Sequence, residues 1–324
     1  MKIKLAEELV GLEKIDLLGG PIGAFSNNLN DLKLSFTNNL SDAEIVLVPH
    51  DLHLIAGIPE YINYLNKLSS KKPILISNRW DMPTKLKVAN SYQLRFAILP
   101  NERINNFIVV PYNVKSLTEL PFREYSTSPR ISFVGYQPKL TAGRMVRSIK
   151  TFPIHPLMNN SVFIRKEGAK RILDLDLRND VVIRNIYGAA PSINRNFNQH
   201  RQEFIQSIAN SDLIFSPRGD ANQSQRYYEA LSAGRIPIIP NTSIVFPKTI
   251  NDSGIKFMIL VNVLSTNLEI RIKEFWKNFD QSSYQSFQKE IRKFFNDEIS
   301  YVTYINRLLN SDLQYFFKFV YKKN

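Results

Sequence analysis

The feature that most constrains the fold of this chain is a series of short apolar runs, separated by segments long enough to form helices. In the first part of the chain the runs are 42–48 (DAEIVLV), 73–77 (PILIS) and 107–111 (FIVVP), and the amphipathic segment 59–68 lies between the first two. Apolar runs of this length that end at polar residues or proline are typical of buried strands in a parallel sheet. Their alternation with a helical segment predicts repeated βαβ units, and therefore an α/β domain.

The same pattern begins again after the polar stretch 124–130 (EYSTSPR), which is typical of a linker. Further apolar runs follow at 131–135, 181–183, 213–215, 236–239 and 257–261, and from residue 268 the pattern becomes mostly helical. A chain of 324 residues is long enough for two domains of ordinary size. We predict two doubly wound parallel α/β domains, with boundaries at 1–125 for the first, 126–300 for the second, and 301–324 for a helical tail that packs across both.

The composition excludes several kinds of chemistry and location. The chain contains no cysteine, so disulfides, thiolate metal sites and a cysteine nucleophile are excluded. No apolar run approaches the roughly 18 residues of a membrane-spanning helix, and Glu7 and Glu8 stand where a signal peptide would have its apolar core. We therefore expect a cytoplasmic protein. Its aromatic and lysine-rich end, 316–323, is compatible with peripheral contact at the inner face of a membrane, although packing inside the protein is the commoner role.

The net charge of +13 calls for an anionic partner, which could be nucleic acid, a membrane surface or a phosphorylated small molecule. The basic residues are scattered along the chain, and no recognisable nucleic-acid-binding motif accompanies them. We therefore expect no nucleic-acid partner. The alternative is a non-catalytic protein that binds polyanions or nucleic acid through its basic surface.

The segment 211–240 concentrates the residues that are suited to chemistry. The buried strand 213–215 is followed by the loop 218–223, at the carboxyl end of the strand where open α/β sheets bind ligands. Asn222 or Ser224 can cap the next helix, which should run to about residue 233 and end at Gly234.

Two arginines flank the beginning of this predicted helix. The helix N-terminus together with Arg218 and Arg226 favours a diphosphate. Glu229 lies three residues after Arg226, on the same helical face, where its carboxylate could hold ribose hydroxyls. The alternative is that Arg226 pairs with Glu229 at the surface and Arg218 pairs with Asp220 in a turn. Spacing leaves both interpretations open, because no stricter glycine-rich phosphate loop is present.

The same segment resembles the signature of the exostosin family of glycosyltransferases. The matching elements are 217–220 (PRGD), Ser224, 226–231 (RYYEAL) and 234–239 (GRIPII), with continuations at 244–247 and 256–261 and weaker ones at 133–135 and Arg144. The chain departs from the family in having Phe215-Ser216 where a cysteine is usual and in lacking the membrane anchor of eukaryotic members. It is therefore similar to a soluble, bacterial-type member, and Golgi residence and heparan-type substrates are not carried over.

The resemblance implies a GT-B fold, in which two Rossmann-like domains face each other across a cleft. It also implies inverting transfer of a sugar from a nucleoside diphosphate, with UDP favoured, to a glycan or lipid-linked glycan acceptor, without a metal or other cofactor. The donor-binding residues that it implies are Arg218, Gly219, Ser224, Arg226, Glu229 and, more loosely, Arg144.

Two constellations could instead indicate a metal, and we expect neither to bind one. Asp174 and Asp176 form an Asp-x-Asp pair, but the leucines around them favour the end of a packed helix with two exposed acids. His50 and His53 are the only close histidine pair, which is too few ligands for a structural metal site.

The general base of an inverting reaction should come from the N-terminal domain. Asp51 follows the strand 42–48 and Asp81 follows the strand 73–77, so both face the crevice of a parallel sheet. We expect one of them to be the base, with Asp51 slightly favoured because its strand is better defined. The alternative for each is to cap the turn or helix that follows its strand.

Overall fold

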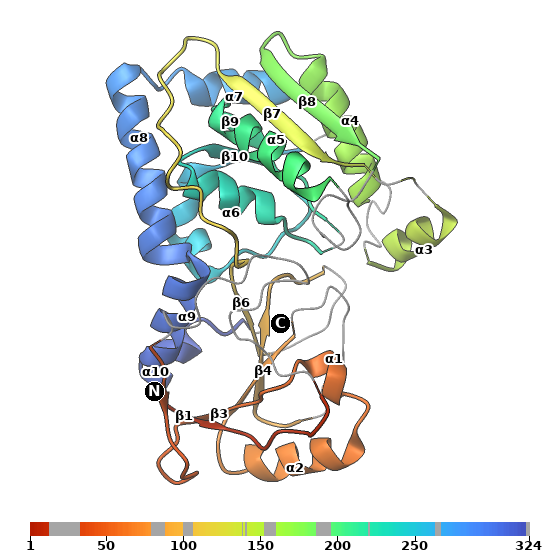
Figure 1. Ribbon diagram of the computed structural model, residues 1–324, viewed down its shortest axis with the longest axis vertical. Helices are drawn as coiled ribbons and strands as arrows, with labels where there is room; N and C mark the ends of the chain where they lie inside the picture. The colour runs from red at the N-terminus through yellow and green to blue at the C-terminus, as the bar shows by residue number, and fades with distance from the viewer. Residues whose placement is uncertain are drawn as a thin grey trace.

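The computed structural model describes residues 1–12, 33–78, 88–99, 106–137, 139, 141–151, 160–185, 196–219, 221–262 and 267–321. It contains two parallel β-sheets flanked by helices, one in each half of the molecule (Figure 1). The predicted fold class, α/β with two Rossmann-like domains, is confirmed. The cleft that a GT-B fold implies between the domains stays a prediction.

The N-terminal sheet has the strand order β2-β1-β3-β4-β5-β6, and every neighbouring pair is parallel. Its strands are β1 (Lys2–Leu5), β2 (Ser35–Phe36), β3 (Ile45–Leu47), β4 (Ile74–Ser77), β5 (Ser91–Arg95) and β6 (Phe107–Val109), and its helices are α1 (Leu52–Ile55) and α2 (Pro59–Ser69). Helix α2 begins at a proline, whose fixed φ favours a first helical turn, and it buries Tyr61 and Leu65 against Ile74 and Ile76. The predicted strands 42–48, 73–77 and 107–111 correspond to β3, β4 and β6.

The C-terminal sheet has the order β11-β10-β9-β7-β8 and is also parallel throughout. All five apolar runs predicted for this domain contribute to its strands. These are β7 (Arg130–Tyr136), β8 (Arg178–Arg184), β9 (Leu213–Phe215), β10 (Ile236–Pro240) and β11 (Ile259–Val261). The helical elements between them are α3 (Ala142–Thr151), α4 (Ser161–Leu173), α5 (Phe197–Ala209), α6 (Gln225–Ser232), η2 (Ile250–Gly254) and η3 (Ile255–Phe257).

Both sheets have the same topology around their first strand. The second strand lies on one side of the first, and the third strand lies on the other. The winding direction therefore reverses between β1 and β3 in the N-terminal sheet and between β7 and β9 in the C-terminal sheet. In open α/β sheets, the crevice at the carboxyl ends of such a strand pair is the usual place for a ligand.

The C-terminal helices lie beside both sheets. They are α7 (Leu268–Trp276), α8 (Gln281–Phe294), η4 (Phe295–Ile299), α9 (Tyr301–Asn310) and α10 (Leu313–Phe317). Helix α8 runs along the C-terminal domain, and α9 and α10 lie beside the N-terminal sheet (Figure 1). The hydroxyl of Tyr304 on α9 donates to the carbonyl of Val109 at 3.1 Å.

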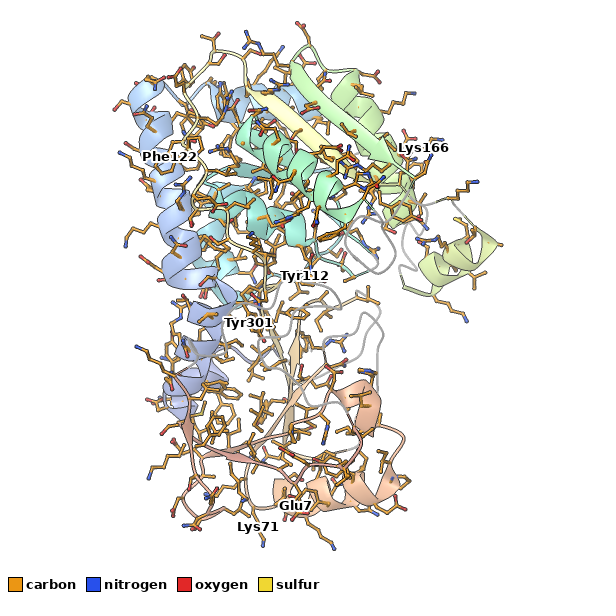
Figure 2. All side chains as sticks on the ribbon, viewed as in Figure 1. Glu7, Lys71, Tyr112, Phe122, Lys166 and Tyr301 are labelled. Carbon is orange, nitrogen blue, oxygen red and sulfur yellow. The ribbon has the colours of Figure 1, made fainter. Side chains whose placement is uncertain are left out.

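Aromatic side chains fill the junction between the domains. Phe96 stacks on Tyr112 with ring centroids 4.6 Å apart, and Tyr112 meets Tyr228 of α6 edge to face. Figure 2 shows Tyr112 and Tyr301 close to this junction. Phe316 and Phe319, at the end considered for membrane contact, are buried. These two aromatic residues therefore pack inside the protein.

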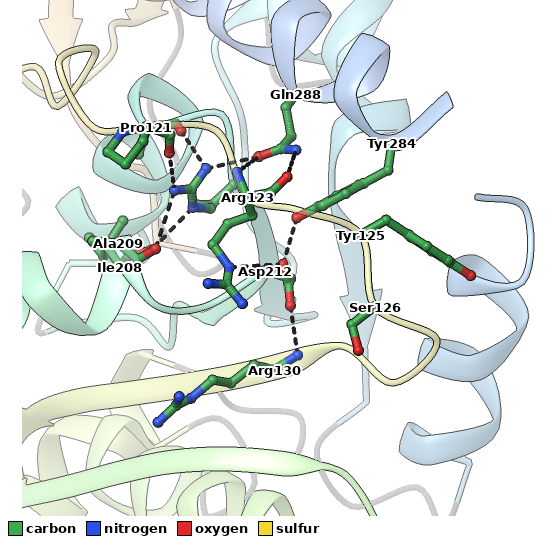
Figure 3. A network of polar contacts seen from close by, with 12 residues as sticks. Pro121, Arg123, Tyr125, Ser126, Arg130, Ile208, Ala209, Asp212, Tyr284 and Gln288 are labelled. Atoms are coloured by element: carbon green, nitrogen blue, oxygen red, sulfur yellow. Dashed lines mark hydrogen bonds and ion pairs between the residues drawn. The ribbon is translucent and has the colours of Figure 1, made fainter. Parts of the chain in front are cut away.

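A buried polar network holds the interdomain segment 110–129 against the C-terminal domain (Figure 3). Arg235 is fully buried and donates to the carbonyl of Pro121 at 2.7 Å and to Gln288 Oε1 at 3.0 Å. Burial lowers the pKa of Arg235 to about 10. Asp212 accepts from the Tyr284 hydroxyl at 2.9 Å and from the backbone amide of Arg130 at 2.8 Å, which fixes the beginning of β7.

None of the helices in the described ranges is both long and apolar enough to cross a membrane.

Candidate functional site

Three arginines meet at the carboxyl edge of the C-terminal sheet, where the winding direction reverses. They are Arg165 of α4, Arg184 at the end of β8 and Arg226 of α6, and we call them the arginine cluster. They come from elements that are far apart in the sequence and lie near the ends of β7, β8 and β9. Arg184 also forms a salt bridge with Glu203 of α5. Positive charges gathered in this way favour an anionic ligand.

Helix α6 begins and ends where the sequence predicts. Ser224 is the N-cap, and its hydroxyl accepts from the backbone amide of Arg226 at 3.3 Å. Gly234 follows the helix with φ of +71°, a conformation that glycine adopts without strain. Asn222, the other predicted cap, instead bonds to Thr242.

The guanidinium of Arg226 lies at the end of β7. It donates to the carbonyl of Val134 at 3.0 Å and lies 5.2 Å and 5.5 Å from the ring centroids of Phe133 and Phe204. A Cβ on Gly135 would come within 2.9 Å of an Arg226 guanidinium nitrogen, so the glycine permits this close approach. The Nε atom of Arg226 is buried and has no hydrogen-bond partner within the described residues.

Arg165 joins the ends of the two strands. Its Nε donates to the carbonyl of Arg218 at 3.2 Å, and its Nη1 donates to the carbonyl of Tyr136 at 2.8 Å. Burial lowers the pKa of Arg226 to about 10, and the positive charges of Arg165 and Arg184 add to this effect. A cation that is buried beside other cations is stabilised by an anion, because an opposite charge restores the charged form.

The loop before α6 is closed on itself. Arg218 is largely buried, and its Nε donates to the carbonyl of Ala221 at 3.3 Å. The amide of Gly219 donates to the carbonyl of Gln223 at 3.2 Å. Asp220, the partner considered for Arg218, lies outside the described residues.

Glu229 is buried and forms its salt bridge with Arg201 of α5 rather than with Arg226. The Arg201 Nη1 to Glu229 Oε1 distance is 2.5 Å. Burial raises the pKa of Glu229, while the charges of Arg201 and Arg226 oppose the rise. The carboxylate is therefore held in one orientation, one helical turn from Arg226.

Arg144 lies beside the cluster, in a separate cavity of about 310 Å³. The cavity is lined by Tyr136, Gln137, Lys139, Thr141, Arg144 and Asn185, at the ends of β7 and β8. It adjoins the arginine cluster because the carbonyl of Tyr136 accepts from Arg165. The side chain of Arg147, a neighbouring cation on α3, lies outside the described residues.

Asp51 lies at the carboxyl edge of the N-terminal sheet, just after β3. Its carboxylate caps α1 through the amide of His53 at 3.4 Å and pairs with His53 Nδ1 at 2.8 Å. The hydroxyl of Ser77 at the end of β4 donates to the second carboxylate oxygen at 3.3 Å. The other candidate base, Asp81, lies outside the described residues, as does Arg79.

The two constellations considered for a metal are placed differently from the arginine cluster. Asp174 is the C-cap of α4, and both it and Asp176 are exposed in the turn before β8, at the opposite edge of the sheet. His50 Nε2 accepts from the amide of Leu9 at 2.8 Å. The described residues include no group of three or more acidic or histidine side chains placed to hold a metal ion.

Sequence reasoning identified α6 and its loop but missed Arg165, Arg184 and Arg201. No motif marks these arginines, because their position depends on which faces of α4 and α5 meet the strand ends. The pairing of Asp51 with His53 was also missed, although a histidine two residues after a capping aspartate is visible in the sequence.

Comparison with known families matches the region that carries the site. The family model of the RXYLT1 C-terminal domain, which is exostosin-related, matches residues 172–260. This span includes β9, the loop at Arg218 and all of α6. No curated protein matches the chain.

Several solved structures resemble the chain distantly. TarM has a TM-score of 0.38 and 12% identity over 77% of this chain, which spans 57% of the TarM chain. The catalytic domain of starch synthase IV from Arabidopsis thaliana, bound to ADP and acarbose, has a TM-score of 0.40 and 10% identity over 82% of this chain and 72% of that one. Anabaena Alr3699/HepE, in complex with UDP and glucose, has a TM-score of 0.36 and 9% identity over 82% and 76%. Similarity at this level carries nothing about the site.

Proposed function

We propose that this chain is a metal-independent, inverting glycosyltransferase that transfers a sugar from a nucleoside diphosphate, with UDP favoured, to a glycan or lipid-linked glycan. The observation that carries the proposal is the arginine cluster at the carboxyl edge of the C-terminal sheet. The match of residues 172–260 to the RXYLT1 C-terminal domain supports it, because that span contains the same loop and helix.

The diphosphate would occupy the cluster. Arg226 Nε is buried without a partner among the described residues, and a buried donor of this kind carries a cost that a phosphate oxygen removes. Arg165 and Arg184 lower the pKa of Arg226 in the unliganded protein, and a diphosphate would reverse that effect. The N-terminus of α6, capped by Ser224, adds backbone amides and a favourable dipole.

The nucleoside would extend along α6 toward Glu229. Arg201 contacts the Oε1 atom of this carboxylate, and we assign the Oε2 atom to a ribose hydroxyl. The cavity at Arg144 adjoins the cluster and is lined by polar and basic side chains, so we assign it to the sugar or to the acceptor.

An inverting reaction needs a base on one side of the sugar and a stabilised leaving group on the other. The guanidinium groups at the C-terminal sheet would stabilise the departing diphosphate in place of a metal ion. The base is assigned to the end of β3, where Asp51 lies. A cytoplasmic location and a lipid-linked acceptor at the inner face of a membrane are part of the same proposal.

Nucleotide binding tests the proposal directly. We expect UDP to raise the melting temperature in the presence of a chelator, by the equivalent of about 2.7 kcal/mol at a hundredfold excess over Kd. Stabilisation that appears only with manganese or magnesium would overturn metal independence. The absence of stabilisation by any nucleoside diphosphate would overturn the donor site.

The salt dependence of binding distinguishes the proposed function from the polyanion-binding alternative. Binding of polyanions to an exposed basic surface weakens steeply as the salt concentration rises. A nucleotide bound at these half-buried arginines should lose much less affinity between 50 mM and 500 mM sodium chloride. Equal, steep salt dependence for UDP and for heparin would favour the alternative.

A further inference from the structure

The end of β3 holds an aspartate and a histidine in fixed geometry. Asp51 Oδ1 lies 2.8 Å from His53 Nδ1, and Ser77 from the adjacent strand donates to Asp51 Oδ2 at 3.3 Å. The side chain of Asp51 is 5% exposed, whereas that of His53 is 29% exposed. The carboxylate is therefore enclosed by its partners, and the imidazole reaches the surface.

This geometry determines which nitrogen of His53 carries the proton. An ionised carboxylate can only accept hydrogen bonds, so the Nδ1 atom that faces Asp51 must donate. In the neutral ring, the lone pair then lies on Nε2, which is the atom able to take a proton. A carboxylate that orients a histidine in this way is the arrangement that makes an imidazole an effective general base.

The location matches the requirement for a base from the N-terminal domain. His53 lies in α1, immediately after β3, at the strand end where the winding direction of the sheet reverses. Helix α1 lies on the side of this domain that is turned toward the C-terminal domain (Figure 1). The nearby His50 is not suited to the role, because its Nε2 accepts from the amide of Leu9 and the residue is fully buried.

We propose that His53 is the catalytic base of the sugar transfer and that Asp51 is its positioning residue, an inference that rests on the proposed glycosyltransferase function. His53 Nε2 takes the proton from an acceptor hydroxyl, and the oxygen of that hydroxyl bonds to the anomeric carbon. The bond from that carbon to the diphosphate oxygen breaks, and its electron pair leaves with the diphosphate. The anomeric configuration is inverted in this single displacement.

The assignment changes the role predicted for Asp51 itself. Both of its carboxylate oxygens are engaged, one by His53 and the other by Ser77, and the side chain is almost fully buried. An acceptor hydroxyl would have to displace these partners to reach it. The His53 side chain is 29% exposed, so an acceptor can approach its ring from the surface.

The test compares His53→Ala with two variants of Asp51 in the full-length protein. We expect His53→Ala to lower kcat by at least about a hundredfold and to leave the Kd for UDP within about twofold. Added imidazole should restore part of the lost rate, since a small base can enter the space left by the ring. Glu60→Ala, on the exposed part of α2, is the control and should neither lose activity nor respond to imidazole.

The Asp51 variants separate positioning from helix capping. Asp51→Ser keeps a good N-cap residue but removes the partner of His53, so we expect stability to be nearly retained and kcat to fall at least tenfold. Asp51→Asn should behave in the same way. Wild-type rates in both variants would overturn the positioning role.

The outcomes distinguish this inference from the proposed function. If the unmodified protein neither binds a nucleoside diphosphate nor transfers sugar, the proposed function fails and the inference fails with it. If it transfers sugar and His53→Ala does so at the same rate, or is slow but not restored by imidazole, only the His53 assignment is overturned. If His53→Ala does not fold, His53→Gln replaces it, with a loss of kcat at unchanged UDP affinity as the expected result.

Discussion

The carboxyl edges of the two sheets share one local backbone arrangement but present different groups, a candidate base in the N-terminal domain and cations in the C-terminal domain. In each domain the third strand leads into a helix whose N-cap side chain accepts from the backbone amide two residues later. Asp51 accepts from His53 in the N-terminal domain, and Ser224 accepts from Arg226 in the C-terminal domain. In both cases the residue two positions after the cap is the one that we assign to the reaction.

The difference lies in the charge of the cap. Asp51 is a carboxylate, and it also binds the side chain of His53, which fixes the imidazole for proton transfer. Ser224 is neutral and adds no charge beside Arg226, which lies near the guanidinium groups of Arg165 and Arg184 and near the carboxylate of Glu229. One local design can therefore position either a base or a phosphate-binding cation, depending on whether the cap residue carries a negative charge.

The largest expected effect comes from removing the cation of the C-terminal edge. Arg226→Ala should weaken UDP binding by about a hundredfold, because a buried charge-assisted contact is lost, and should lower transfer by up to about a thousandfold. Titration calorimetry with UDP gives the first number, and a transfer assay gives the second.

The same assays on the N-terminal edge provide the contrast. His53→Ala should lose transfer but keep UDP binding, so the two variants differ in affinity although both are inactive. UDP affinity in Arg226→Ala equal to that of the unmodified protein would show that the donor site lies elsewhere.

The second effect concerns the salt bridge that fixes Glu229. Glu229→Gln removes the negative charge that faces Arg201, so we expect a loss of about 2–3 kcal/mol in the free energy of unfolding. Replacing both residues, as Arg201→Met with Glu229→Leu, should recover most of this loss, because two apolar side chains of similar size require no pairing. Chemical denaturation measures both.

UDP binding in the double variant decides whether Glu229 also contacts the ribose. If the pair is only structural, the double variant should bind UDP as well as the unmodified protein. A tenfold weaker affinity at recovered stability would support the ribose contact.

The fold was more predictable in the C-terminal domain than in the N-terminal one. Each of the five C-terminal strands contains a predicted apolar run, whereas β1, β2 and β5 were missed. The run in β8 is partly exposed, although runs of this kind predict buried strands. β1 has only Ile3 fully buried, and β5 buries Gln93 and Arg95, which bond to Asn78 Nδ2 and to the carbonyl of Ala97. A strand whose buried positions are polar cannot be found from apolar runs, because its partners lie elsewhere in the chain.

The residues of the candidate site also divide into those that local spacing predicts and those that it does not. The cap at Ser224, the stop at Gly234 and the position of Arg226 depend on local spacing, so the sequence predicts them. Arg165 bonds to the ends of two strands, β7 and β9, that are neighbours in the sheet but far apart along the chain. Ser77 meets Asp51 only because β3 and β4 are neighbours in the sheet. Contacts of this kind depend on sheet order, which spacing along the chain does not specify.

The third effect tests why a glycine occupies the second-to-last position of β7. Gly135→Ala would place a Cβ 2.9 Å from the Arg226 guanidinium, which must then move. We expect UDP affinity to fall about tenfold while most of the stability is retained, because a flexible side chain can shift at modest cost.

Two further glycines serve as controls for this variant. Gly143→Ala, with nothing within 4 Å of its added Cβ, should leave UDP affinity unchanged. Gly168→Ala would bring a Cβ within 2.2 Å of the Phe215 ring, so it should lower stability instead. A loss of UDP affinity in Gly143→Ala, or none in Gly135→Ala, would contradict the assigned position of Arg226.

The smallest effect comes from changing the N-cap residue of α6. Ser224→Ala removes the N-cap of α6 and should lower the free energy of unfolding by about 1 kcal/mol, with UDP affinity changed less than about threefold. Ser224→Asp keeps the cap and adds a favourable charge at the helix N-terminus, so its stability should equal or exceed that of the unmodified protein. Its carboxylate would, however, compensate the charge of Arg226 and would repel a diphosphate. We therefore expect Ser224→Asp to bind UDP about three- to fivefold more weakly. Ser224→Asp should thus be the more stable of the two variants, and Ser224→Ala the one that binds UDP more tightly. Equal UDP affinity in the two variants would mean that the phosphates do not approach the beginning of α6, and that the neutrality of its cap has no part in the site.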